Sequence, residues 1–190
     1  MERNIAQVAL FAAMIAALGL VPQITLGFGV PITAQTLGVM LAGAVLGARR
    51  GGAAAGLFLL LVALGLPLLA GGRGGLGVFV SPTAGFALGF PVAAFATGLF
   101  VEHVRLRSAG LSAGLGAVFG GIVVLYLLGA SGLSIVSGKP LAEAFRLVAV
   151  FIPGDLLKAG ITGMLVQALV RARPQTLPWY RAAGEAGPRL

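Results

Sequence analysis

Two charged residues, Asp155 and Lys158, stand out because they lie in the otherwise apolar segment FIPGDLLKAGITGMLVQALV. Their spacing of three residues places both side chains on the same face of a helix. Charges at membrane depth are costly, and they generally face the interior of a helix bundle or a water-filled cavity. We therefore predict that the pair lines a polar pocket. The alternative is a structural ion pair whose two charges only neutralise each other.

Pro153 and Gly154 directly precede this pair. Proline is tolerated in the first turn of a helix and disrupts its interior, so a helix is expected to begin near Pro153. The free N–H groups and positive dipole of such a helix start suit a polar ligand. Counted back from Arg171, the expected membrane boundary, Asp155 lies about 24 Å away at 1.5 Å per residue. The pair would thus lie in the opposite leaflet.

Three connections on the same side as Asp155 contain further polar residues. Gln35 and Thr36 belong to the segment PITAQT, Arg73 lies in the glycine-rich segment AGGRGG, and Ser81 and Thr83 belong to SPT. Each could cap a helix or shape a turn. Because all of them are expected at one face of the membrane, we predict that they complete the pocket around Asp155.

Several kinds of chemistry are excluded by the residues that are absent. The chain contains no cysteine, which excludes disulfides and thiolate metal sites. It has no GxxxxGK[ST] phosphate loop, and its single histidine, His103, lies in a basic segment. No Ser–His–Asp or paired-carboxylate arrangement can be assembled. We expect neither enzymatic activity nor a metal or cofactor, although a membrane-embedded enzyme using Asp155 as acid or base remains an alternative.

The composition indicates an all-α integral membrane protein. Of 190 residues 58% are hydrophobic and 9% charged, whereas soluble domains carry about 25% charged residues. A helical span needs about 20 apolar residues. We predict six transmembrane helices, near residues 5–21, 32–46, 53–66, 84–101, 111–130 and within 141–170.

The expected domain organisation is one membrane domain, residues 1–171, followed by a cytoplasmic tail, residues 172–190. Three residues of the tail, Trp179, Tyr180 and Arg181, are of types that anchor proteins at lipid headgroups, and we expect them there.

The basic residues indicate the orientation in the membrane. With six spans both termini share a side, and nine of the basic residues fall there: Arg3, Arg49, Arg50, Arg105, Arg107, Arg171, Arg173, Arg181 and Arg189. Only Arg73 and Lys139 fall in connections on the opposite side. The positive-inside rule then predicts that both termini are cytoplasmic. The net charge of +8 is explained by topology, so no nucleic-acid partner is expected.

The first predicted span has a stripe of small residues, Ala9, Ala13 and Ala17, four residues apart. Small residues let a neighbouring helix approach closely in a membrane. The stripe could dock another membrane subunit, or it could pack within the bundle.

A series of ordered segments carries a resemblance to a known family: ALFAA (9–13), VPITAQTLGV (30–39), LGARRG (46–51), GLP (65–67), AGGRGGLG (70–77), SPTAGF (81–86) and PGDLLK (153–158). Over about residues 5–171 the chain resembles the BioY family, the biotin-binding S components of energy-coupling factor (ECF) transporters. The resemblance implies a six-helix S-component fold in the bacterial cell membrane and biotin capture from outside. It also implies partnership with a transmembrane coupling subunit and cytosolic ATPases, with Ala9 and Ala13 in the docking surface.

Biotin is chemically compatible with the candidate residues. Its ureido N–H groups could donate to Asp155, while Lys158 could donate to the ureido oxygen or act as the counter-ion of Asp155. Arg73 is a candidate partner of the valerate carboxylate. The apolar part of the ligand would pack on Leu68, Phe79 and Phe86. An S component for another small vitamin is the alternative ligand assignment, and transport without an ATPase stays open.

Overall fold

The structure is a computed structural model that describes residues 2–25, 27, 30–104, 106–173 and 176–180. Most of this chain is helical, and a hairpin of two short strands, each of two residues, lies between the first two helices. The α-helices are α1 (Glu2–Leu18), α2 (Gln35–Leu46), α3 (Ala48–Ala63), α4 (Ala84–His103), α5 (Ala109–Val118), α6 (Leu125–Ser137), α7 (Leu141–Val148) and α8 (Ile152–Ala172). Shorter helical turns are η1 (Leu76–Val80), η2 (Phe119–Val124) and η3 (Ala149–Phe151), and the antiparallel strands are β1 (Ile24–Thr25) and β2 (Pro31–Ile32). The predicted helical class is confirmed.

The longest helical segments are long and apolar enough to cross a membrane. In the described chain these are α4, the continuous segment α5–η2–α6 (Ala109–Ser137), and α7–η3–α8 (Leu141–Ala172), with α2 as a shorter apolar helix. The segment η2 is a π-helical stretch within one long helix. Pro153 lies in the first turn of α8, as the sequence predicts.

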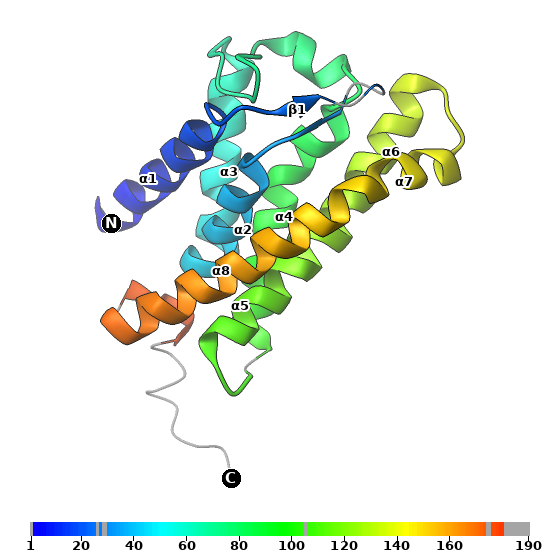
Figure 1. Ribbon diagram of the computed structural model, residues 1–190. Coiled ribbons are helices and arrows are strands. Elements are labelled where there is room, and N and C mark those ends of the chain that lie inside the picture. Colours follow the sequence, from blue (N-terminus) through cyan, green and yellow to red (C-terminus); the bar gives the residue numbers. More distant parts are fainter. Residues whose placement is uncertain (1, 26, 28–29, 105, 174–175, 181–190) are drawn as a thin grey trace.

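The connections alternate between two ends of the bundle (Figure 1). The start of α1, the α2–α3 turn, the α4–α5 link and the end of α8 lie at one end, which we call the terminal end. The β1–β2 hairpin, the connection from α3 to α4 and the α6–α7 turn lie at the other end, which we call the connection end. Asp155, in the first turn of α8, therefore lies toward the connection end.

Helix α4 lies at the centre of the bundle, against α2, α3, α5 and α6. Glycines make these contacts close: a Cβ atom at Gly43 of α2 would overlap the Ala94 carbonyl oxygen of α4, and one at Gly98 of α4 would overlap the Ala48 nitrogen. Small residues at such crossings let backbones touch, which is how membrane helices associate.

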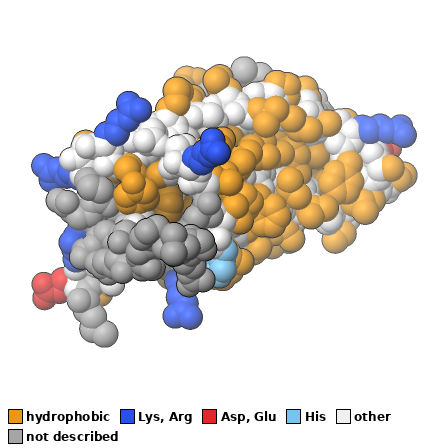
Figure 2. Space-filling model, turned by 90° about the horizontal axis from the view of Figure 1, so that it is seen from below, with side chains coloured by type: hydrophobic (Ala, Val, Ile, Leu, Met, Phe, Trp, Pro, Cys, Tyr) orange, Lys and Arg blue, Asp and Glu red, His pale blue; other side chains and the backbone are white. Residues whose placement is uncertain are grey.

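Large apolar side chains are exposed on the outside of the bundle. Figure 2 shows a broad apolar surface with basic side chains placed around it. Leu88, Leu127 and Met164 are among the exposed residues. A continuous apolar surface of this extent is unusual for a soluble monomer and is suited to lipid.

The turn between α2 and α3 is a sharp reversal at Gly47, whose φ of 82° favours glycine. It leaves two backbone groups without helical partners, and side chains from distant segments bind both. The Ala48 N–H donates to Glu102 Oε1 of α4 at 2.8 Å, and the Ala44 carbonyl accepts from Trp179 Nε1 at 2.8 Å.

The sequence predicts Trp179 at the lipid headgroups, but its indole N–H binds within the protein instead. Its side chain is buried and donates to the Ala44 carbonyl near the end of α2, and Leu177 is fully buried, so the segment 176–180 packs against the bundle. Tyr180 is exposed, and Arg181 lies outside the described residues.

We predict that Trp179→Phe destabilises the protein by about 1–3 kcal/mol, because it removes the indole N–H and leaves the Ala44 carbonyl buried without a partner. Thermal unfolding in detergent measures the change. Tyr180→Phe is the matched control, since Tyr180 is exposed, and it should unfold like the wild type. Equal unfolding midpoints for the two variants would contradict the role of Trp179.

Candidate functional site

A cavity of about 60 Å³ lies toward the connection end of the bundle, between α2, α4, α6, α8 and the segment before α4. One water needs about 10–15 Å³ by this measure, so the cavity has room for several. Its lining residues are Val30, Ile32, Thr33, Gln35, Thr36, Leu69, Arg73, Thr83, Phe86, Ala87, Phe90, Leu125, Phe151, Asp155 and Lys158. We call this cavity the central pocket.

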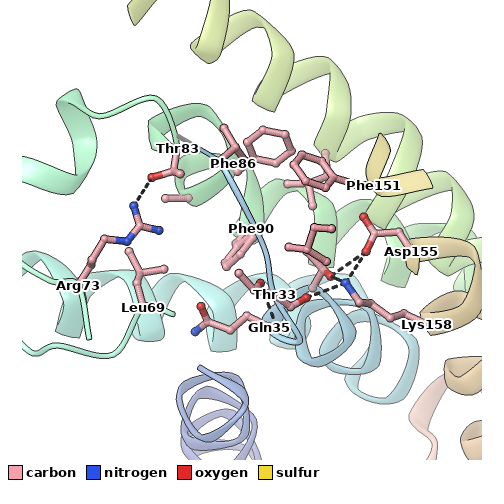
Figure 3. A pocket seen from close by; sticks show the side chains of 15 residues that line it. Thr33, Gln35, Leu69, Arg73, Thr83, Phe86, Phe90, Phe151, Asp155 and Lys158 are labelled. Carbon is pink, nitrogen blue, oxygen red and sulfur yellow. Dashed lines mark hydrogen bonds and ion pairs between the residues drawn. The ribbon is translucent and has the colours of Figure 1, made fainter. Parts of the chain in front are cut away.

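Asp155 and Lys158 form an ion pair at one end of the central pocket (Figure 3). Lys158 Nζ lies 2.7 Å from Asp155 Oδ1, and the side chains are 17% and 5% exposed, respectively. The three-residue spacing on α8 produces this geometry, as the sequence predicts. Because both charges are shielded from solvent, their attraction is stronger than that of a surface pair.

Lys158 uses all three of its donors within the protein. Besides Asp155, Nζ donates to the Thr33 carbonyl at 2.7 Å and to Thr36 Oγ1 at 2.9 Å. An ammonium group has three N–H donors and no acceptor. Lys158 thus ties the start of α8 to the start of α2 and can reach a ligand only by releasing one of these partners.

Asp155 accepts three hydrogen bonds: from Lys158 and Thr36 Oγ1 on Oδ1, and from the Tyr126 hydroxyl on Oδ2 at 2.6 Å. A carboxylate offers about four acceptor positions. Oδ2 therefore keeps one position that no donor in the described part of the chain fills. Tyr126 was not predicted from the sequence, although a tyrosine inside an apolar span was a usable signal.

Arg73 lies at the opposite end of the central pocket, close to Thr83 (Figure 3). Its Nε donates to the Ala70 carbonyl at 3.2 Å, and Nη1 donates to Thr83 Oγ1 at 3.1 Å. Neither ion pair found in the described chain includes Arg73. Burial lowers the pKa of Arg73 from its ordinary value, but an arginine stays protonated at neutral pH. This end of the pocket can bind an anion.

Aromatic side chains lie between the two charged ends (Figure 3). Phe86 packs edge-on against Tyr126 and Phe151, with ring centroids 6.2 and 6.3 Å apart. Phe86 and Phe90 are four residues apart on α4, so both point to the same side of that helix. The middle of the pocket is apolar and suits a hydrocarbon or thioether part of a ligand.

Gln35 lines the central pocket, but its amide group is bound to the protein. Nε2 donates to the carbonyls of Ile15 and Leu68, at 3.1 and 3.0 Å, and Oε1 accepts from the Ala70 N–H at 2.9 Å. Both amide hydrogens are therefore used. Gln35 joins α1, α2 and the Arg73 segment, and it acts on the pocket by holding the wall in place.

Most of the sequence-predicted site residues meet at the pocket. Those that line it are Gln35, Thr36, Arg73, Thr83, Phe86, Asp155 and Lys158. In the described part of the chain, Phe79, Ser81 and Leu68 do not line the pocket. Leu69 lines it where Leu68 was expected. Ser81 lies one contact away, with its hydroxyl 2.9 Å from Thr83 Oγ1. Sequence reasoning missed Phe90 and Phe151, because phenylalanine is common in any protein interior and does not by itself indicate a binding site.

No group of three or more His, Cys, Asp or Glu side chains within the described residues could hold a metal ion.

The predicted docking stripe lies on the outside of the bundle. Ala9, Ala13 and Ala17 are exposed, whereas Ala12 and Ile15 are the buried residues of α1. Internal packing therefore does not use the stripe in this chain.

Comparison with known proteins places this architecture in one family. The profile described as "BioY family" matches residues 2–175. The chain is 54% identical over 186 residues to the biotin transporter BioY of Rhodobacter capsulatus, covering 93% of this chain and 98% of the relative. It is 52% identical over 178 residues to the biotin transporter BioY of Rhizobium etli, covering 90% and 95%.

The fold has a solved counterpart. A crystal structure at 2.1 Å of "the S-component for biotin from an ECF-type ABC transporter" superimposes with a TM-score of 0.83 at 33% identity, covering 89% of this chain and 91% of the other. Because the family profile spans nearly the whole bundle and these relatives match from end to end, the chain belongs to the BioY family of membrane transport proteins.

Proposed function

We propose that this chain captures biotin in the central pocket, as the substrate-binding subunit of an ECF-type importer. The observation that carries the proposal is a pocket with a carboxylate at one end, an arginine outside both ion pairs of the described residues at the other, and aromatic rings between them. Relatives that match from end to end are named biotin transporters, and the similar crystal structure is of a biotin S component. The family is one of transporters rather than enzymes.

Biotin has a hydrogen-bond-donating ureido ring at one end and a carboxylate at the other, and the pocket has Asp155 at one end and Arg73 at the other. A ureido N–H can donate to the open acceptor position on Asp155 Oδ2 without displacing Lys158 or Tyr126. Such a charge-assisted hydrogen bond is stronger than a neutral one. Lys158 then acts as counter-ion to Asp155, because its own donors are occupied. The valerate carboxylate would reach Arg73, and the thiophane ring would pack among Phe86, Phe90 and Phe151.

For the membrane arrangement we propose six spans with both termini in the cytoplasm. The alternation of connections between the two ends of the bundle supports termini on one side (Figure 1). The positive-inside bias of the basic residues supports the cytoplasm as that side. The central pocket would then open toward the outside, where substrate is captured. We propose that residues 1–171 form the membrane domain and residues 172–190 a cytoplasmic tail. Leu177 and Trp179 of this tail are buried against the domain.

The partners we propose are a transmembrane coupling subunit and cytosolic ATPases of the ECF type. The exposed stripe Ala9, Ala13 and Ala17 on α1 supports a helix-docking role, because small side chains let a partner helix approach closely. An S component for a different vitamin would need a ligand that matches both pocket ends, and competition binding distinguishes it.

Equilibrium binding of labelled biotin to the detergent-purified chain tests the function. We expect tight binding, selective against other vitamins, and a loss of at least tenfold in Asp155→Asn, since a hydrogen bond to a charged group contributes about 1.5–3 kcal/mol. Glu143→Gln is the matched control, because it removes a carboxylate from an exposed ion pair. Full affinity in a folded Asp155→Asn protein would refute the assignment.

We further predict that Ala13→Leu abolishes co-purification with the coupling subunit while biotin binding persists, because the larger side chain keeps the partner helix at a distance. Ala142→Leu, at an exposed position on α7, is the control and should co-purify normally. Undiminished assembly of Ala13→Leu would show that the partner docks elsewhere.

A further inference from the structure

A second hollow, distinct from the central pocket, runs along the outside of the bundle between α5 and α8. The two helices cross closely at Gly110 and Gly163, where a Cβ atom on either residue would come within 2.8 Å of the carbonyl oxygen of the other. Beside this crossing the floor is open. The nearest atom to a Cβ at Gly114 is 3.5 Å away, and a Cβ at Gly160 would meet nothing within 4 Å.

Most of the side chains that line this α5–α8 groove are apolar. Its rim contains Leu111, Leu115, Leu156 and Met164, which are 52%, 44%, 49% and 66% exposed. In a bilayer these side chains and the glycine floor between them would contact acyl chains, because the groove lies on the outer surface of two spanning segments.

One end of the groove is polar and basic. Ser108, Gln167 and Arg171 line it at the terminal end of the bundle. Gln167 Oε1 accepts from the Gly110 N–H at 3.0 Å, which holds its amide beside the groove. Arg171 is exposed and takes part in neither ion pair of the described chain. An apolar channel that ends at a free guanidinium is complementary to an amphiphile with an anionic head.

We propose that the α5–α8 groove seats an acyl chain of an anionic phospholipid whose phosphate binds Arg171, assisted by the Gln167 amide. Guanidinium groups bind phosphate with paired N–H donors and are favoured over other cations for that reason. A transmembrane helix of a partner would fill the apolar part of the groove and leave the cation without a counter-charge, so charge complementarity favours the lipid. The proposal does not depend on biotin binding.

A bound lipid stabilises the folded protein by mass action, and thermal unfolding detects it. The probes are phosphatidylglycerol and phosphatidylcholine with identical acyl chains, added to delipidated protein in neutral detergent. We expect phosphatidylglycerol to raise the unfolding midpoint by several degrees more than phosphatidylcholine does, and native mass spectrometry to show one retained phosphatidylglycerol.

Two pairs of variants locate the site. Arg171→Gln should remove the preference for phosphatidylglycerol, whereas Arg49→Gln, another exposed arginine at the terminal end, should keep it. A Cβ atom at Gly160 would meet nothing within 4 Å, so Gly160→Leu can place its side chain in the groove and should prevent retention of lipid. Gly56→Leu on α3, where a Cβ is equally unobstructed, should not.

Equal stabilisation by both lipids, or equal behaviour of Arg171→Gln and Arg49→Gln, would overturn the proposal. Wild-type lipid retention in Gly160→Leu would also overturn it. Loss of a co-purifying protein subunit in Gly160→Leu, with lipid retention unchanged, would identify the groove as a protein interface instead.

Discussion

The buried ion pair of Asp155 and Lys158 is the interaction on which the rest of the site depends. Leaving one member of a buried pair without its partner costs about 3–5 kcal/mol. The fold therefore surrounds the pair with matched polar groups: Thr36 and the Thr33 carbonyl from the start of α2, and the Tyr126 hydroxyl from α6. Three helices that are far apart in sequence are fixed to one another at this point.

The opposite wall of the pocket is fixed by a neutral side chain. Gln35 follows the Thr33 segment directly and binds the Ile15 carbonyl on α1 together with the chain at Leu68 and Ala70. The same turn of α2 thus contacts the ion pair through Thr36 and the Arg73 segment through Gln35. Helix α1, which carries the exposed alanine stripe, is hydrogen-bonded to the pocket wall through that amide. These hydrogen bonds connect the segments that carry the two charged ends of the pocket.

The sequence was most informative where a residue type conflicts with its surroundings. Asp155 and Lys158 are costly in an apolar segment, so their presence predicted a pocket, and Pro153 predicted the start of α8. Arg73 stood out for the same reason among glycines. In contrast, Phe90 and Phe151 are ordinary in a membrane span, and only the packing of α4 against the segment before α8 brings them to the cavity. Tyr126 reaches the site through its hydrogen bond to Asp155.

The role of Gln35 and the position of Trp179 also depend on three-dimensional contacts. No spacing in the sequence shows that both amide hydrogens of Gln35 are used by carbonyl groups 20 and 33 residues away. Trp179 was expected at the headgroups because of its residue type. The sharp turn at Gly47 instead leaves the Ala44 carbonyl free, and the indole N–H, 135 residues away in sequence, binds it.

We infer that the two ends of the pocket bind the two ends of one ligand. A cycle of four binding constants tests it most directly: wild type and Arg73→Gln, each with biotin and with biotin carboxamide, which lacks the carboxylate charge. We expect the wild type to prefer biotin by tenfold or more, since a hydrogen bond to a charged group contributes about 1.5–3 kcal/mol. Arg73→Gln should lose this preference while its affinity for the carboxamide is unchanged. Equal losses for both ligands in Arg73→Gln would contradict the claim.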